Sequence, residues 1–306
     1  MEITQVTMAN FPDLLDSAMQ VMFKDEIDKY DYLSKIYTFD KPYHDRDYKV
    51  SNRTKLGVAP LLPDGATDFT SDVPYQGYDQ TITQAIYGLQ VAAGLHLKLF
   101  GRFNETASFA TDIAESIVRT IQILGHAPFN NAFDASVTLG DGVCLCSSAH
   151  PRAPGLAGTQ SNISSTPNIL SYTTMQNDLI AWVKLTEDRG GTLLVVPDIV
   201  FLPVDSMFAA LAIEKTLQDP GSALNSINVI RSGFPGITYM KSPYLTDTRR
   251  HFYLAKDRIK LIRIWRAKPN YRTLIDDASE ATVFRGYTAF GVGVADYKWI
   301  FGNAGA

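Results

Sequence analysis

Two cysteines and a histidine lie close together in the middle of the chain and are the first candidates for chemistry. Cys144, Cys146 and His150 form the pattern C-x-C-x3-H. A structural zinc site needs four ligands at compatible spacing, but the chain has only these two cysteines, and its other histidines are scattered. The pattern therefore favours two small buried strand residues and a turn histidine over a metal site.

A catalytic site with a cysteine nucleophile and a histidine base is the more specific alternative. His150 follows Cys146 on the same strand and turn, so it is poorly placed to act as that base. An enzyme of this kind would need a distant histidine. Replacing both cysteines by serine separates the two hypotheses, because a hydrolase would lose its activity while a structural protein would still assemble.

Three further sequence patterns are better explained by structural roles than by catalysis. The glycines of Gly291–Asp296 lack the βαβ unit that a dinucleotide fingerprint opens, so close packing in a terminal strand explains them. Asp276 and Asp277, with Glu280 nearby, are a possible paired-carboxylate site, but a solvated turn between strands is favoured. The charged run 187–189 at the end of an expected helix indicates an exposed surface.

Composition limits the function classes. The 306 residues exceed the usual single-domain size of roughly 100–150 residues, so two or three sub-domains are expected. The net charge of −4 offers no basic excess for nucleic-acid binding. No apolar run approaches the ~18–20 residues that span a bilayer, and the N-terminus lacks the features of a secretory signal. Neighbouring cysteines at i and i+2 on a strand point to opposite faces, so no disulfide is expected.

The first third of the chain predicts an arm followed by an extended loop. Residues 1–40 contain apolar side chains at helical spacing between Leu14 and Met22, followed by an aromatic and charged segment. Residues 41–84 are polar and rich in turns, with Pro63-Asp64-Gly65 at the centre. A segment of this kind has little core of its own, which suggests packing on a partner.

A strand and a long helix follow. The side chains of Tyr87, Leu89 and Val91 alternate as in a half-buried strand, and the alternation resumes over residues 95–99. Asn104 is the expected cap of a helix that ends at Gly125 and is about 30 Å long. Its apolar stripe has one member per turn: Phe109, Ile113, Ile117, Ile121 and Leu124.

The central segment, Gly140–Gln218, organises the rest of the chain. It opens with a turn, Asp141–Pro151, and continues through a loop rich in Gly, Ser and Asn that lacks the lysine of a phosphate-binding loop. We expect a helix over 172–189, a strand over 195–197 and a second helix from Asp205. Short strands are then expected over 227–230, 237–240, 251–255 and 259–266, and closing strands over 282–301.

Four tyrosines lie in turn-rich polar sequence, where core filling does not readily explain them. Aromatic residues are enriched in protein–protein interfaces because they bury a large area at low entropy cost. The predicted inter-subunit contacts are therefore Tyr43, Tyr48, Tyr75 and Tyr78. No catalytic, cofactor-binding or metal-binding residue is predicted.

The order of these segments resembles the major capsid proteins of tailed phages with the Hong Kong 97-like fold. The motifs that carry the resemblance are Asp-Gly-x-x-Leu-x-Ser-x-x-His-Pro from Asp141, the Leu-Val-Val-Pro strand ending at Pro197, and the Gly291–Asp296 tail. Within that group the sequence is most similar to the Mu-like major head subunits. The resemblance implies an α+β fold with an N-arm, an extended β-hairpin loop, a peripheral domain with a long spine helix, and an axial domain.

By position, the resemblance also implies domain boundaries. The expected parts are the N-terminal arm at 1–40, the extended loop at 41–84, the peripheral domain at 85–150 and 259–306, and the axial domain at 151–258. The axial domain would meet its copies around five-fold and six-fold axes. The loop would lie across the adjacent subunit.

The function that the resemblance implies is a major capsid protein that assembles, as hexamers and pentamers, into an icosahedral shell around double-stranded phage DNA. Expected partners are scaffold, portal, and decoration or minor capsid proteins, with no cofactor, no membrane and no sequence-specific DNA binding. The expected location is the virion, after assembly in the bacterial host cytoplasm. Two alternatives remain open: an encapsulin-like compartment shell and a cysteine-dependent hydrolase.

Overall fold

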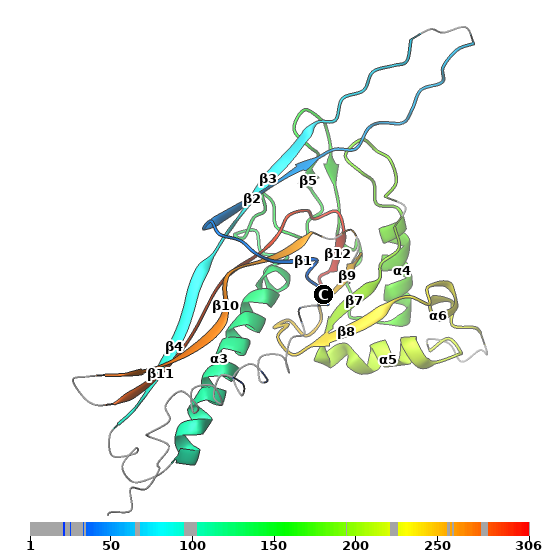
Figure 1. The fold of residues 1–306 in the computed structure, drawn as a ribbon. Coiled ribbons are helices and arrows are strands. Elements are labelled where there is room, and N and C mark those ends of the chain that lie inside the picture. The colour runs from blue at the N-terminus through cyan, green and yellow to red at the C-terminus, as the bar shows by residue number, and fades with distance from the viewer. Residues whose placement is uncertain are drawn as a thin grey trace, which may run out of the picture.

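A computed structural model gives the fold of the chain (Figure 1). It describes residues 21, 25, 33, 35–64, 68–94, 103–193, 195–220, 226–255, 258, 260–276 and 281–305. Several sequence predictions lie outside the described residues. These are the arm helix at 14–22, the continuing strand at 95–99, and the carboxylates Asp277 and Glu280.

The first sheet has four strands in the order β1–β10–β11–β4. Strand β10 (Leu261–Ile275) pairs antiparallel with β11 (Thr282–Val294), which pairs antiparallel with β4 (Ala85–Ala93). The end of the arm adds β1 (Phe39–Pro42) parallel to β10. The prediction of strands over 259–266 and 282–301 is confirmed, although β10 is longer than expected because its pairing with β11 resumes after the register shifts near Ala267 and runs to Ile275.

One long helix, α3 (Phe103–Asn130), covers one face of this sheet (Figure 1). At 1.5 Å per residue its 28 residues span about 42 Å. Its apolar stripe packs against Trp265, Tyr271, Phe284 and Phe290 of the sheet, as the sequence periodicity predicts. The helix begins one residue before Asn104, whose side chain lies outside the described residues.

The prediction that this helix ends at Gly125 is wrong. The helix continues for another turn, through Pro128, and brings the fully buried Phe129 into the core. A glycine inside a helix costs only ~1 kcal/mol, and here it makes room for the arm. A Cβ on Gly125 would lie 2.0 Å from Leu33 Cδ1, and the Tyr37 hydroxyl donates to the Gly125 carbonyl at 2.7 Å.

The second sheet has the order β12–β9–β7–β8. Strand β7 (Ile199–Pro203) pairs parallel with β8 (Thr238–Ser242) and antiparallel with β9 (His251–Leu254). Helix α4 (Tyr172–Val183) packs on it through Met175, Leu179 and Trp182. A short 3-10 helix η2 (Val204–Ser206), helix α5 (Met207–Lys215) and helix α6 (Val229–Gly233) complete this unit.

Three predictions in this unit are corrected. Helix α4 ends at Val183 rather than 189, because the chain turns at Lys184 into a hairpin bridged by Thr186 and Thr192. Residues 195–197 form no strand: the Val195 carbonyl accepts from Trp182 Nε1 at 2.6 Å, and the sheet strand begins two residues after Pro197.

The third correction concerns residues 227–230, which were expected to form a strand. Asn228 caps helix α6 instead, and its side-chain oxygen accepts from the Arg231 amide at 3.1 Å. Ile227 forms only an isolated bridge with Gln218. The strands expected at 237–240 and 251–255 are present as β8 and β9.

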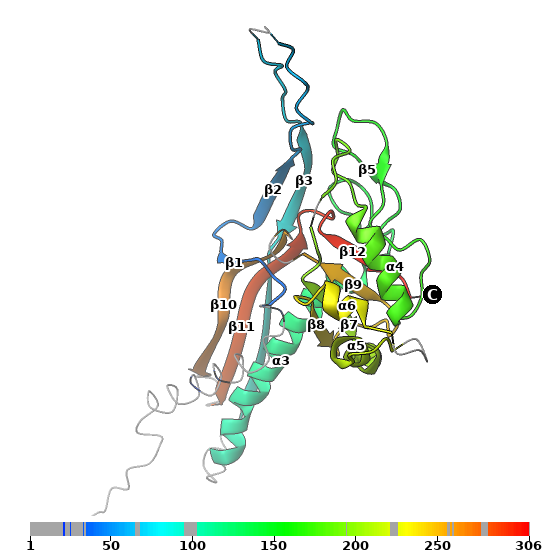
Figure 2. The same ribbon diagram turned by 90° about the vertical axis from the view of Figure 1, so that its right-hand side faces the viewer.

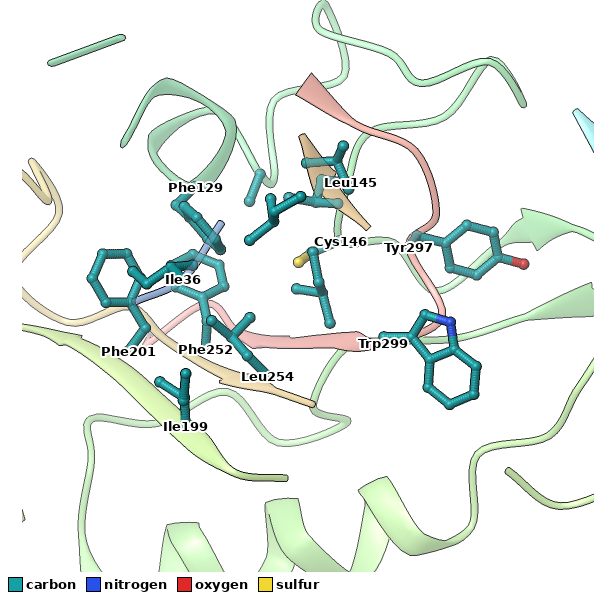
Figure 3. Close-up of a cluster of buried hydrophobic side chains, with 14 of the residues drawn as sticks. Ile36, Phe129, Leu145, Cys146, Ile199, Phe201, Phe252, Leu254, Tyr297 and Trp299 are labelled. Atoms are coloured by element: carbon teal, nitrogen blue, oxygen red, sulfur yellow. The ribbon is translucent and has the colours of Figure 1, made fainter. Parts of the chain in front are cut away.

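The two sheets share one core, which Figure 3 shows. The ring of Phe129, from the end of α3, lies 5.0 Å from Phe201 of β7 and 5.3 Å from Phe252 of β9, centroid to centroid. Ile36 of the arm and Trp299 of the tail complete the cluster.

The last strand of the chain's described part belongs to the second sheet. Strand β12 (Ile300–Asn303) pairs with β9 and is fully buried in the second sheet. The side chains of this strand pack with α4, as Phe301 does with Trp182.

The extended loop projects away from these sheets. Strands β2 (Asp47–Arg53) and β3 (Gln76–Thr83) pair antiparallel and form its base. The chain between them extends away from the body, as both views show (Figures 1 and 2). A small ribbon, β5 (His150–Pro151) with β6 (Thr159–Gln160), stands beside this base. Among the described residues, no helix is both long and apolar enough to cross a membrane.

Candidate functional site

The cysteines and His150 do not form a reactive set. Burial raises the pKa of the Cys146 thiol well above its usual range, and burial also raises the pKa of Cys144. The thiolate is the nucleophile, so both side chains are held in the unreactive form. His150 bonds through Nδ1 to Asp141 Oδ2 at 2.7 Å and stacks on Tyr297, while the Cys144 thiol donates to the Cys146 carbonyl.

The other chemical candidates also have structural explanations. A Cβ on Gly291 would lie 2.7 Å from the Thr83 carbonyl oxygen, and one on Gly293 would lie 2.6 Å from Ile82, so close packing against β3 requires both glycines. A groove of about 300 Å³ between α3 and β11 has no charged residue in its lining. Among the described residues, no cluster of His, Cys, Asp or Glu could hold a metal ion.

The base of the extended loop is the site that the structure singles out instead. Tyr43 and Tyr48 pack edge to face, with ring centroids 4.8 Å apart, and both contact a small core that includes Ile82 of β3 and Ile264 of β10. Two predicted interface tyrosines therefore join the loop base to the chain's own first sheet. Whether they also touch a neighbouring subunit stays a prediction.

Hydrogen bonds hold the same base against the body. Asn52 of β2 donates to the Ala295 carbonyl at 2.5 Å and accepts from Lys260 Nζ at 2.6 Å. A Cβ on Gly140 would lie 2.1 Å from the Asp79 carbonyl oxygen, so only glycine lets β3 pass this close. The base of the loop is thus fixed in direction.

A charged hairpin turn, Thr186–Thr192, clamps the next part of the loop. An isolated bridge joins the two ends of this turn, and Gly190 takes a positive φ of 83° that favours glycine. Glu187 accepts a bond from Lys55, and Arg189 pairs with Asp72. The charged run was expected to be an exposed surface, but two of its residues bind the outgoing and the returning segment of the loop.

Arg189 is the centre of this clamp. It also donates to the Val73 carbonyl at 2.9 Å and lies over the Tyr75 ring, 5.1 Å from its centroid. The hydrogen bond from Arg189 lowers the pKa of Asp72. Between the two loop contacts, Asp188 faces inward and accepts from Lys298 Nζ at 2.5 Å. The sequence signal that could have revealed this turn is the Gly-Gly pair that follows the three charges.

Beyond the clamp, the loop exposes large apolar side chains. Val58, Leu61 and Phe69 are 91%, 93% and 86% exposed. Large apolar side chains that stay exposed on a projecting segment are candidates for contact with another molecule. Of the remaining predicted tyrosines, Tyr75 is 45% exposed beside this patch, while Tyr78 is partly buried against the body. Sequence analysis missed the apolar residues because they follow neither strand nor helix spacing.

The arm is anchored in a comparable way. Leu33, Ile36 and Tyr37 are buried under the end of α3. Asp40 receives both Nε and Nη2 of Arg263, at 3.2 and 2.7 Å, and the Trp265 indole also donates to it. Burial would raise the pKa of Asp40, but the bonds and charge of Arg263 outweigh it and lower the pKa.

The fold is similar to that of several solved structures at low sequence identity. The capsid of the Myoviridae phage XM1 has a TM-score of 0.57 at 14% identity, covering 90% of this chain and 91% of that one. A virus-like particle from Pyrococcus furiosus has a TM-score of 0.55 at 12% identity, with 94% and 98% covered. For Mycobacterium phage Bobi the TM-score is 0.53 at 11% identity, with 89% and 88% covered. The predicted Hong Kong 97-like fold is confirmed.

The sequence itself matches a family model, described as "Phage capsid protein", over residues 79–303. The chain belongs to this phage capsid protein family. As a phage capsid protein it has its place in the shell of a virion, and this membership favours a phage capsid over a compartment shell. Membership indicates a structural role, as opposed to an enzymatic one. No curated protein matches the sequence.

Proposed function

We propose that copies of this chain join through their loops and arms into hexameric and pentameric rings, which close into an icosahedral shell around double-stranded DNA. The observation that carries the proposal is the extended loop: its base is fixed to the body, while its far part exposes Val58, Leu61 and Phe69. A free subunit cannot bury these side chains on itself, because the loop projects away from both sheets (Figures 1 and 2). A contact in which the loop of one subunit binds a different surface of the next subunit is of the head-to-tail kind, and such contacts generate rings when the rotation between subunits closes.

The finer assignments rest on the same resemblance. The chain is proposed to be nearest the Mu-like head subunits and to assemble in the host cytoplasm with scaffold, portal, and decoration or minor capsid proteins. The proposed domains are the arm at 1–40, the loop at 41–84, the peripheral domain at 85–150 and 259–306 without β12, and the axial domain at 151–258 with β12. The transfer of β12 is supported by its pairing with β9.

The acidic net charge of −4 supports a protein shell that encloses DNA without binding it tightly. A shell that bound packaged DNA tightly would resist packing and release, whereas weak repulsion would not.

Assembly of the purified protein tests the proposal directly. The chain is expressed alone and with the product of its upstream gene, then examined by negative-stain electron microscopy and light scattering. Closed shells, tubes or rings of megadalton mass are expected. A monodisperse monomer or dimer under both conditions would contradict the proposal.

Two variants test whether the apolar side chains of the loop drive assembly. The change Val58→Ser, Leu61→Ser and Phe69→Ser removes the apolar loop contacts, and we expect folded subunits that do not form shells. The control Thr70→Ala and Ser71→Ala alters exposed polar positions of the same loop and should assemble as the wild type does. Equal shell yields from both variants would show that the loop does not drive assembly.

A further inference from the structure

The hairpin turn Thr186–Thr192 is seated on the body through its central residue, Asp188. This residue is 5% exposed, and its Oδ2 accepts from Lys298 Nζ at 2.5 Å. Arg152 Nη1 donates to the Asp188 carbonyl at 2.8 Å. Because these groups are mostly withdrawn from water, salt screens their contacts little. The turn is therefore a fixed part of the body.

The charged residues on either side of Asp188 bind the extended loop instead. Glu187 pairs with Lys55, and Arg189 pairs with Asp72. The side chains of Glu187 and Arg189 are each 17% exposed, whereas Lys55 is 60% exposed and Asp72 is 39% exposed. The hairpin thus offers two preformed charges, which the loop meets with side chains that stay largely in water. Ion pairs of this exposed kind are weak and are screened by salt.

The order of the charges makes this contact specific. The outgoing segment of the loop carries the cation Lys55, and the returning segment carries the anion Asp72, so each segment has its own counter-charge on the hairpin. Arg189 also donates to the Val73 carbonyl at 2.9 Å and lies over the Tyr75 ring. Two pairs of opposite polarity fix the loop in one direction, which a single tether would not do.

The loop has a bending point just below these contacts. The pairing of β2 with β3 shifts register between Ser51 and Arg53, where Asn52 stands opposite two residues, Gly77 and Tyr78. A bulge of this kind interrupts the ladder of backbone hydrogen bonds and bends the strands. Below it the strands pack against the first sheet, whereas the chain beyond it extends away from the body (Figure 2). The loop can therefore swing at the bulge once the hairpin contacts open.

We propose that Glu187 and Arg189 are positioning residues that form a salt-sensitive clamp, which fixes the direction of the loop in the free subunit and releases it to pivot at the bulge. The inference rests on the proposed loop-mediated assembly and adds what sets the direction of the loop before subunits meet. Ordering a segment before it binds reduces the entropy that is lost on association. Clamped subunits should therefore assemble at a lower concentration than unclamped ones.

Distance measurements on dissociated subunits test the clamp without assembly. Spin labels are attached at Thr70→Cys in the loop and at Asn177→Cys on α4, both exposed positions, in a Cys144→Ser background. Cys146 is buried and stays unlabelled. Double electron–electron resonance then gives the distribution of distances between the two labels. We expect a narrow distribution at about 0.01 M salt and a broad one at about 1 M, where the Debye length is only about 3 Å.

Three variants and a matched control assign the effect to the clamp. Lys55→Glu places like charges opposite each other and should broaden the distribution at low salt. Lys55→Glu combined with Glu187→Lys restores opposite charges and should narrow it again. Arg189→Ala should broaden it as well. The control Lys49→Ala removes an exposed ion pair with Asp79 within the loop base, away from the hairpin, and should leave the distribution narrow.

Several outcomes would overturn the clamp. The distribution for the wild-type clamp could be broad at low salt, or could stay narrow at high salt. Lys55→Glu or Arg189→Ala could leave it narrow, or the reversed pair could fail to narrow it again. Lys49→Ala could broaden it as much as Arg189→Ala does, which would make the effect a general one of lost ion pairs.

Assembly assays separate the clamp from the function on which it rests. If the wild type forms no shells at any concentration, the proposed function fails, while the distance distributions still decide whether the clamp exists. If shells form, Arg189→Ala should need a subunit concentration at least about threefold higher, a modest factor because exposed ion pairs are weak. Equal threshold concentrations for Arg189→Ala, Lys49→Ala and the wild type would show that the clamp does not serve assembly.

Discussion

A buried carboxylate in the second sheet offers the sharpest test of how the subunit is held together. Asp178 of α4 is fully buried, and a single oxygen, Oδ2, lies within hydrogen-bonding distance of three side chains. The Tyr253 hydroxyl lies 3.2 Å from it, Asn303 Nδ2 lies 2.9 Å from it and His251 Nε2 lies 3.1 Å from it. One residue thereby joins the helix to β9 and β12.

We predict that Asp178→Ala lowers the free energy of unfolding by about 4 kcal/mol. Breaking a buried ionic network by removing one partner costs roughly 3–5 kcal/mol, because the remaining donors stay buried without an acceptor at ~1–3 kcal/mol each. Asp178→Asn keeps an oxygen where the three donors converge and loses only the charge. Its expected cost is about 1–2 kcal/mol.

Urea unfolding of dissociated subunits measures both values, with Trp182 on the same helix as a fluorescent reporter. Asn177→Ala, at the exposed neighbouring position, is the control for removing a polar side chain from α4. It should be neutral or slightly stabilising, since alanine favours helix. The reasoning is refuted if Asp178→Ala costs less than about 1 kcal/mol, or if Asp178→Asn is as damaging as the alanine variant.

Three further predictions follow from the clamp, the loop base and a buried imidazole. Arg189 pairs with Asp72, and Asp72 accepts a hydrogen bond from the Gly57 amide. Arg189→Ala should therefore speed hydrogen exchange at the Gly57 amide without moving the midpoint of urea unfolding. Unchanged exchange would show that Arg189 does not clamp the loop. Gly140→Ala should cost about 1–3 kcal/mol in urea unfolding, because its Cβ meets the β3 backbone, whereas the control Gly191→Ala, which has open space, should be neutral. Burial lowers the pKa of His126 to about 4, so the unfolded chain takes up the proton first and stability falls as the pH drops from 6.5. The loss approaches about 3 kcal/mol near pH 4, and His126→Gln should flatten this dependence in urea titrations; an unflattened curve would assign it to other groups.

The sequence predicted the elements whose pattern is set locally. The stripe from Phe109 to Leu124 needs only one apolar side chain per turn, and the α3 face is as expected. The alternation of apolar and polar side chains also predicted strands at β10 and β11. The family resemblance supplied the order in which these elements assemble, which periodicity alone does not give.

Predictions failed where tertiary contacts decide the local structure. Gly125 is a usual helix terminator, but here Leu33 packs against it from a segment about ninety residues earlier, and the helix continues. Ile227 to Ile230 have strand-forming side chains, yet Asn228 caps a helix whose amides it satisfies. Propensity is a weak prior that such contacts override.

The candidate site was predicted only in outline. The turn-rich composition of residues 41–84 indicated an extended loop, which the structure contains. The charges that clamp it, Glu187 and Arg189, were read as solvent-exposed because their partners lie more than a hundred residues away. An ion pair between distant segments has no local sequence signature, whereas helix periodicity does.

The burial of β12 has a consequence for how the subunit is synthesised. This strand ends at Asn303 and forms the border of the second sheet, where Phe301 is packed against Trp182. On the ribosome, the sheet cannot be completed until β12 has left the exit tunnel, because long-range strand pairing waits for both partners. A prematurely terminated chain therefore lacks a buried strand and exposes the core that it should cover.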